Sequence, residues 1–205
     1  MTYLQNNFSS TSTIASDYGY IDDASTFFSE FSESWKSVKS QVLKLEQRQT
    51  YVERGNVSLE LFLEGKVGES IALIPEIRSG DLDLYKNLQS RKVDFFRCRP
   101  VQLPLSEYLK WEFECYHFNI KYGEKIYCLD WNVFQNHFDE IIQHDFMVFD
   151  HSLAFIHDYD DRGEIQGGWV ISKPAHITNL IAVYSLVKAM SLNFEIYMKK
   201  IEFER

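Results

Sequence analysis

Two arginines carry the clearest chemical signal in this sequence. Arg97 and Arg99 are two positions apart in a stretch of Val, Phe, Cys and Pro residues, 93–101, which is typical of a β-strand. Successive side chains of a strand point to opposite faces, so both guanidinium groups should project from one face. Arginine binds carboxylate and phosphate groups through a planar fork of donors. The spacing therefore predicts an anion-binding face, with an ordinary ion pair as the alternative.

Two glutamates are placed to reach that face. Glu112 falls on the helix expected to begin at Pro104, and Glu124 follows Gly123, the expected end of that helix. Either carboxylate could therefore return to the arginine strand and form the ion pair. If it does not, the arginines remain free to take a ligand.

Two aspartates bracket the apolar run FMVF, residues 146–149, which reads as a buried strand. Asp145 and Asp150 would then lie at strand ends, where α/β folds place their ligands beside a cleft. The alternative for Asp150 is a turn that its side chain starts by accepting backbone hydrogen bonds. The predicted ligand-binding set is Arg97, Arg99, Glu112, Glu124, Asp145 and Asp150, and no catalytic residue is predicted.

Histidines and carboxylates also crowd the middle of the chain, and such groups can bind metals. Their spacing does not favour a metal site, because His151 and His157 on one extended strand would lie about 20 Å apart. No metal is therefore predicted. The cluster comprises His137, His144, Asp145, Asp150, His151, His157 and Asp158.

The cysteines and aromatic residues favour a packed core over a reaction centre. Cys98, Cys115 and Cys128 are widely spaced, form no CxxC motif and are expected to be reduced thiols in or near the core. Cys115 and His117, two apart on a helix, point to different sides and cannot act as a nucleophile and its base. A stacking platform is one interpretation of the remaining aromatics, although core packing is favoured. These are Tyr108, Trp111 and Trp131.

Composition excludes several classes of protein. The 205 residues are 45% hydrophobic and carry a net charge of −9 without a basic block, which argues against disorder and against a general nucleic-acid binder. No apolar run approaches the roughly 20 residues of a membrane span, and the N-terminus lacks the features of a secretory signal. No nucleotide-binding, hydrolase, zinc-protease or calcium-binding motif is present, so no cofactor is predicted. A soluble, cytoplasmic protein is expected.

The chain is expected to open with an arm. Residues 1–22 are rich in Ser, Thr and Asn and are predicted to be flexible, with a segment that orders against a partner as the alternative. Residues 23–54 are predicted to form one amphipathic helix whose apolar stripe must be covered by the domain or by a second copy of the chain. That requirement predicts a homo-oligomer through residues 23–54 as one arrangement. The stripe consists of Phe27, Phe31, Trp35, Val38, Val42 and Leu45.

Residues 55–205 are predicted to form a single domain in which strands alternate with helices. The stretch 145–172, with turn residues between Val-, Ile-, Phe- and Trp-rich segments, predicts a hairpin central to a mixed sheet. This pattern gives an α/β fold, with α+β as the alternative. Further strands are expected at 57–64, 70–74, 93–101 and 126–131, and helices at 81–90, after Pro104 and after Pro174.

Five short motifs in this order resemble an uncharacterised bacterial domain family, common in actinobacteria beside helix-turn-helix regulators. They are LEQRQTY at residues 45–51, RCRPVQLPLSEYLKWE at 97–112, YGEKI at 122–126, DFMVFD at 145–150 and DYDDRG at 158–163. The resemblance covers residues 45 to about 195 and implies only an association with regulatory loci. The last part also resembles phospholipase-D-like half-domains used as sensor modules. The H-x-K motif of active phospholipase-D-like domains is missing, since His117 and Lys121 have the wrong spacing. The resemblance therefore implies a catalytically inactive domain.

Together these observations predict a non-catalytic regulatory or accessory module that binds a partner protein, such as a regulator, or a small anionic ligand. The alternative is an enzyme acting on a phosphate ester or a modified peptide, with the histidine and carboxylate cluster as acid, base or metal ligands.

Overall fold

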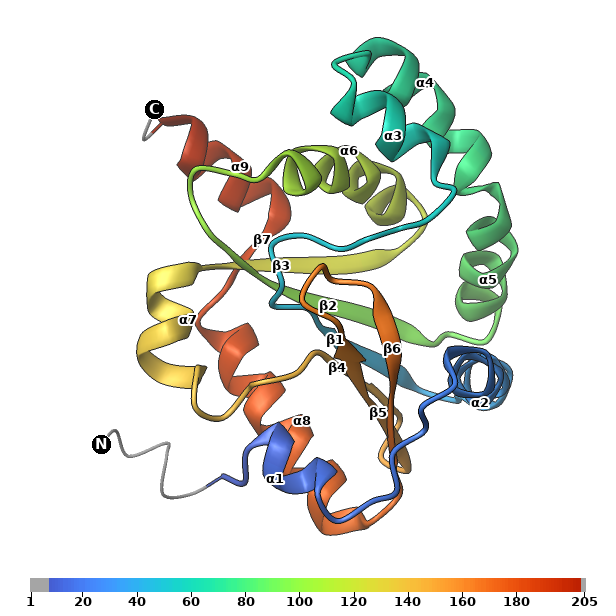
Figure 1. Ribbon diagram of the computed structural model, residues 1–205, viewed down its shortest axis with the longest axis vertical. Coiled ribbons are helices and arrows are strands. Elements are labelled where there is room, and N and C mark those ends of the chain that lie inside the picture. The colour runs from blue at the N-terminus through green and yellow to red at the C-terminus, as the bar shows by residue number, and fades with distance from the viewer. Residues whose placement is uncertain (1–7, 204–205) are drawn as a thin grey trace.

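The computed structural model describes residues 8–203 and is built on a seven-stranded mixed sheet with the strand order β6-β5-β4-β1-β2-β3-β7 (Figure 1). The strands β1, β2 and β3 are parallel, and every other neighbouring pair is antiparallel. The α/β class is therefore confirmed. The strands are β1 (Gln41–Leu45), β2 (Asp94–Val101), β3 (Glu124–Asp130), β4 (Phe146–Phe149), β5 (Leu153–Tyr159), β6 (Ile165–Ile171) and β7 (Leu192–Asn193).

Helices cover both faces of the sheet (Figure 1). One face packs against α1 (Thr11–Ala15), α7 (Trp131–Phe138) and α8 (Pro174–Ala189). The other packs against α2 (Ala24–Ser37), α5 (Ser79–Ser90), α6 (Glu107–Lys121) and α9 (Phe194–Phe203). The pair α3 (Val57–Leu63) and α4 (Val67–Ile77) packs outside α6. None of the described helices has the length and apolar character that a membrane span needs.

The stretch 145–172 forms two successive hairpins. β4, β5 and β6 pair antiparallel in sequence order, with turns after Phe149 and Tyr159. β4 also pairs with β1, so this three-stranded unit is one part of the sheet, and the parallel strands with β7 at their edge are the other. The predicted strand at 93–101 and the helix after Pro174 are also present, as β2 and α8.

The predicted helix over 23–54 is wrong beyond Ser37. Residues 41–45 form β1, the strand between β4 and β2, because Val42, Leu43 and Leu45 are buried on both faces of the sheet. Apolar residues at such short spacings fit a fully buried strand as well as a helix. The aromatic part of the stripe, on α2, packs against Phe149 and Phe155 of the same chain, so the predicted oligomer is not needed to cover it.

Two predicted strands are helices. Residues 57–63 form α3, which begins where the Asn56 side chain accepts a hydrogen bond from the Leu59 amide at 3.2 Å. Residues 70–74 lie within α4, where Ser70 bonds Ser58 of α3. The alternation of apolar residues at 57–63 suggested a strand, but Leu59 and Phe62 also share a helical face.

The flexible arm predicted for residues 1–22 is wrong for its described part, residues 8–22. Ile14 is fully buried, and the Ile21 backbone forms a bridge with Gly168 at the edge of the sheet. Residues 1–7 lie outside the part of the chain that the structure describes.

Candidate functional site

The two arginines of β2 lie on one face of the strand, as predicted, but neither faces solvent. Arg99 is fully buried and Arg97 is 7% exposed. Arg97 donates through Nε to Glu124 at 2.6 Å and through Nη1 to Glu46 at 2.6 Å. Arg99 donates through Nε to Glu112 at 3.1 Å and through Nη1 to the Glu46 carbonyl at 2.9 Å. The structure therefore shows the ion-pair alternative, with both predicted glutamates as partners.

The charges in this buried network balance. Glu46 pairs with both Lys44 and Arg97, which brings three cations to three carboxylates. Burial raises the pKa of Glu46, but the attraction of Arg97 and Lys44 outweighs it and leaves that pKa well below its usual range. Burial lowers the pKa of Arg97, but nearby carboxylates, Glu124 first, raise it well above its usual value. Burial raises the pKa of Glu112, and the attraction of Arg99 only partly opposes that shift. The three cations and three carboxylates are thus matched in number within the network.

Asp145 lies beside this network and is 1% exposed. Its Oδ1 accepts from the Gln47 amide at 2.8 Å, and its Oδ2 accepts from the Tyr51 hydroxyl. Tyr51 in turn accepts from Nη1 of Arg99 at 3.4 Å. Burial raises the pKa of Asp145 to about 6, although these hydrogen bonds oppose the shift. Asp145 therefore connects the arginine network to the end of β1.

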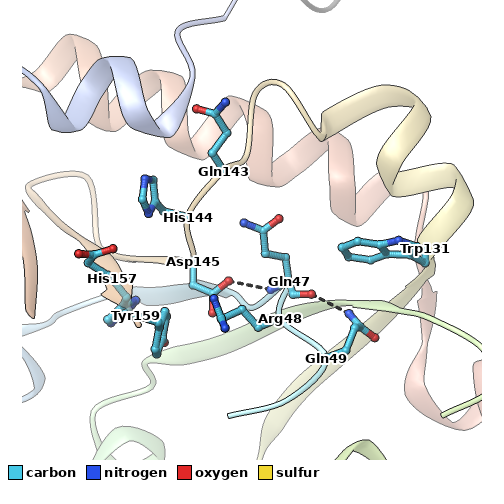
Figure 2. A pocket seen from close by; sticks show the side chains of 10 residues that line it. Gln47, Arg48, Gln49, Trp131, Gln143, His144, Asp145, His157 and Tyr159 are labelled. Atoms are coloured by element: carbon cyan, nitrogen blue, oxygen red, sulfur yellow. Dashed lines mark hydrogen bonds between the residues drawn. The ribbon is translucent and has the colours of Figure 1, made fainter. Parts of the chain in front are cut away.

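A cleft of about 300 Å³ opens at that end of the sheet. It collects the segments that follow β1 and β3, the segment that precedes β4, and the end of β5. Figure 2 shows His144 and Trp131 on opposite sides, with Asp145 and Gln47 between them. A ligand cleft at the carboxyl ends of parallel strands is usual for open α/β sheets. The lining residues are Gln47, Arg48, Gln49, Trp131, Gln143, His144, Asp145, His157, Asp158 and Tyr159.

Arg48 is the arginine of this cleft, and its donors are mostly free. Its Nη2 donates to the Asp160 carbonyl at 3.3 Å, and its guanidinium lies 5.5 Å from the centre of the Tyr159 ring. Its Nε is enclosed and has no hydrogen-bond acceptor among the described residues. Within residues 8–203 no carboxylate lies at ion-pair distance from Arg48, in contrast to Arg97 and Arg99. Arg48 can therefore bind an anion without first giving up a partner.

Asp150 lies outside this site. Its carboxylate accepts from the amides of Lys39 at 2.9 Å, Ser40 at 2.7 Å and Gln41 at 3.1 Å, at the opposite end of β1 from the cleft. Burial opposes the ionised form, but these hydrogen bonds lower the pKa of Asp150 below its usual value. Asp150 does lie in the turn after β4, but its side chain does not start that turn as the alternative proposed; it joins the end of α2 to the start of β1.

Four members of the predicted histidine and carboxylate cluster do line the cleft: His144, Asp145, His157 and Asp158. Burial lowers the pKa of His157 to about 4, so its imidazole is neutral at pH 7. Burial also lowers the pKa of His144. Among the described residues no three His, Cys, Asp or Glu side chains are arranged to hold a metal ion.

All three cysteines are buried and free. Burial raises the pKa of Cys98 to about 12 and that of Cys115 to about 11, which keeps both as thiols. The pKa of Cys128 is raised for the same reason. Trp111 is fully buried and donates from its indole to Ser58 at 2.9 Å, as core packing requires. Trp131 differs, because it is only partly buried and borders the cleft.

Comparison with known proteins assigns the chain to a family but not to an activity. Residues 29–199 match the family described as Domain of unknown function (DUF6879). The chain belongs to this family. The predicted membership of an uncharacterised domain family is confirmed, and the DUF6879 match begins within α2, upstream of residue 45 where the resemblance was expected to start. The bacterial setting and the phospholipase-D-like resemblance stay predictions.

No curated protein matches the DUF6879 chain. A solved structure of TrmBL2, an archaeal chromatin protein that shows a novel mode of DNA binding, aligns with a TM-score of 0.42 and 10% identity. The alignment covers 85% of the DUF6879 chain and 52% of the TrmBL2 chain, so the chain spans about half the length of that protein.

Sequence reasoning missed the segment that carries the cleft. Glu46, Gln47, Arg48, Gln49 and Tyr51 all lie in the motif LEQRQTY, residues 45–51. This motif was assigned to the end of a helix, where its side chains would have spread around the helix axis. Its density of polar and charged side chains beside an apolar strand was the available signal.

Proposed function

We propose that this chain is a non-catalytic regulatory or accessory module that binds a small anionic ligand in the cleft at the carboxyl end of β1. Arg48 is the residue that holds the anion. The sequence predicted the anion site at Arg97 and Arg99, but the donors of both face carboxylates. The proposal places the site at Arg48 instead, which has no carboxylate partner among the described residues. The buried network then serves the site indirectly, because it fixes Asp145 and the loop after β1.

The free donors of Arg48 in an open cleft are the observation that carries this proposal. A guanidinium offers five donors and takes carboxylate or phosphate groups in bidentate fashion. Asp145 presents no competing free carboxylate oxygen, since both of its oxygens accept hydrogen bonds from Gln47 and Tyr51. Asp158 accepts from the Tyr20 hydroxyl at 3.0 Å. Each acid of the cleft therefore accepts at least one hydrogen bond, while Arg48 has one carbonyl acceptor and no carboxylate partner among the described residues.

Titration calorimetry with inorganic phosphate tests the proposal. Arg48→Gln should weaken phosphate binding by about ten-fold or more, because a bidentate charge-assisted contact is lost. Arg162→Gln is the matched control: it removes an exposed arginine from the turn after β5, outside the cleft. Equal phosphate binding by the wild type and the Arg48 variant would refute the assignment.

A hydrolase acting on a phosphate ester is the second candidate. The convergence of His144, Asp145, His157 and Asp158 on one cleft favours it, because neutral imidazoles and carboxylates are the groups that acid–base catalysis uses. Turnover of p-nitrophenyl phosphate, with and without Mg²⁺, Mn²⁺ or Zn²⁺, distinguishes the two candidates. Turnover that is lost in His144→Ala would replace the binding proposal with the catalytic one.

A further inference from the structure

The cleft at the end of β1 has a neighbour on the other side of Trp131. This second hollow, of about 530 Å³, lies beyond the ends of β2 and β3. Trp131 lines both hollows, so they adjoin along one side chain. The lining residues of the second hollow are Val101, Gln102, Leu103, Asp130, Trp131, Asn132, Val133, Gln135 and Lys200.

Both hollows are lined by side-chain amides. None of the five amides named below is hydrogen-bonded through its side chain to another residue in the described part of the chain. Each amide group offers two donors and one acceptor, and so complements hydroxyl groups, which both donate and accept. These amides belong to Gln47 and Gln143 in the first hollow and to Gln102, Asn132 and Gln135 in the second.

A sixth side-chain amide, that of Gln49, links the segments that line the two hollows. The Gln49 side chain donates to the backbone carbonyls of Gln47, at 2.6 Å, and Pro100, at 3.0 Å, and it accepts from the backbone N–H of Gln102 at 2.8 Å. It therefore ties the loop after β1 to the end of β2. The two hollows keep a fixed relation through this contact.

Trp131 supplies an apolar surface between the amides. Its ring stacks on Phe134, with centroids 5.4 Å apart and an angle of 26° between the planes, which fixes its orientation. Figure 2 shows the Trp131 side chain at the border of the cleft, on the side away from His144. A rigid aromatic plane among hydroxyl-matching amides suits a molecule with an apolar C–H face and a polar rim. A pyranose ring has this form.

We infer that the two hollows form one groove for an acidic saccharide, a sugar that carries a phosphate or carboxylate group. The anionic group lies at Arg48, the ring packs on Trp131, and the hydroxyls contact the amides on both sides. This inference rests on the proposed function, because it gives Arg48 the same role. It adds the chemical class of the remaining part of the ligand.

Calorimetry with a defined panel tests the inference. The panel contains glucose 1-phosphate, glucose 6-phosphate, glucuronate and galacturonate, with inorganic phosphate, glucose and AMP as reference ligands. At least one acidic sugar should bind about ten-fold more tightly than both phosphate and glucose, since ring and anion contribute together. A matching gain in melting temperature should accompany the binding.

Two variants locate the sugar. Trp131→Ala should weaken binding of the acidic sugar by about ten-fold and leave phosphate binding unchanged. Gln143→Leu, at an exposed position, should weaken it by about three-fold without affecting the fold, whereas Gln166→Leu on β6 should change nothing. The melting temperature of each variant confirms that it is folded.

The outcomes separate the two claims. Phosphate binding that depends on Arg48, without a gain from any acidic sugar, would overturn this inference and leave the proposed function standing. AMP binding more tightly than every sugar of the panel would replace the saccharide with a nucleotide. If neither phosphate nor any acidic sugar binds, both claims fall.

Discussion

Arg97 and Arg99 show what single residues reveal before the fold is known. Their shared face follows from the alternation of a strand. Glu112, within the following helix, and Glu124, just after the glycine that ends it, were named as partners in the ion-pair alternative. Glu46 could not be placed, because a helix was expected where the structure has β1 and the loop after it. The two arginines were recognised correctly as a chemical pair, whereas their environment depended on a neighbouring strand.

The buried pair gives the first prediction. Arg99→Met should lower the free energy of unfolding by about 3–5 kcal/mol, because Glu112 would be left buried with only the more distant Arg97, at 3.8 Å, as a cation. Urea unfolding followed by far-UV circular dichroism measures the change. Arg54→Met is the control, since the Arg54–Glu164 pair is exposed on the arginine side and its loss should leave the midpoint unchanged. Equal midpoints for all three proteins would show that the network does not stabilise the fold.

Asp145 and His157 should make opposite contributions to the pH dependence of stability. The pKa of Asp145 is raised to about 6, so its contribution is present at low pH and is lost as pH rises through 6. The pKa of His157 is lowered to about 4, so its contribution is present above the ordinary histidine value and is lost as pH falls through 4. Between pH 4.5 and 6.5 the two trends oppose each other.

Single substitutions should expose each trend. Acidification from pH 6.5 to 4.5 should change the free energy of unfolding of each variant differently from that of the wild type. For Asp145→Asn the free energy should fall relative to wild type, and for His157→Gln it should rise, each by on the order of 2 kcal/mol. Urea midpoints measured across this range provide the comparison, and other titrating groups cancel in the differences. Parallel pH profiles for the three proteins would contradict the assigned pKa shifts.

Individual elements were predicted with uneven success, and the reason is the length of each apolar pattern. β2 and α8 are long and regular, and their patterns identified them. α3 has only seven residues, within which apolar side chains at alternate positions fit a strand and a helix alike. The boundary between α2 and β1 was missed because the apolar spacing continues unbroken across it. A contact distant in sequence, from Asp150, marks that boundary.

Asp150 provides a prediction at this scale. Its carboxylate binds three successive backbone amides between α2 and β1, and its own backbone is left-handed, with φ of 53°. Asp150→Gly keeps the backbone conformation accessible but removes the acceptor, so it should destabilise the protein by about 1–2 kcal/mol. Asp150→Asn, which keeps one acceptor oxygen, should cost less. Urea midpoints rank the variants, and an equal cost for both would mean that the amide contacts contribute little.

At the scale of the whole molecule, the cleft arises from the junction of the two halves of the sheet. β1 is parallel to β2 and antiparallel to β4, so the end of β1, the start of β4 and the end of β5 meet at one edge. The residues that line the cleft come from positions between 47 and 159. Strand pairing brings them together, and this pairing cannot be predicted from local sequence patterns. Asp145 was predicted at a strand end beside a cleft. Arg48 was not, because β1 and the loop after it, which carries Arg48, had been assigned to a helix.

The overall charge sets the conditions under which an anion should bind. The chain carries a net charge of −9 at pH 7, and Asp145 and Asp158 add local negative charge to the cleft. Protonation of Asp145 near pH 6 removes one of these charges beside Arg48. Sulfate keeps its own charge over this range, so its affinity should rise by about three- to ten-fold between pH 7 and pH 5. Calorimetry at constant ionic strength measures the change.

Asp145→Asn should bind sulfate more tightly at pH 7 and show a flatter profile of affinity against pH, because its side chain is neutral throughout. A wild-type affinity that falls on acidification would mean that the anion does not sense Asp145, and would place it away from this cleft.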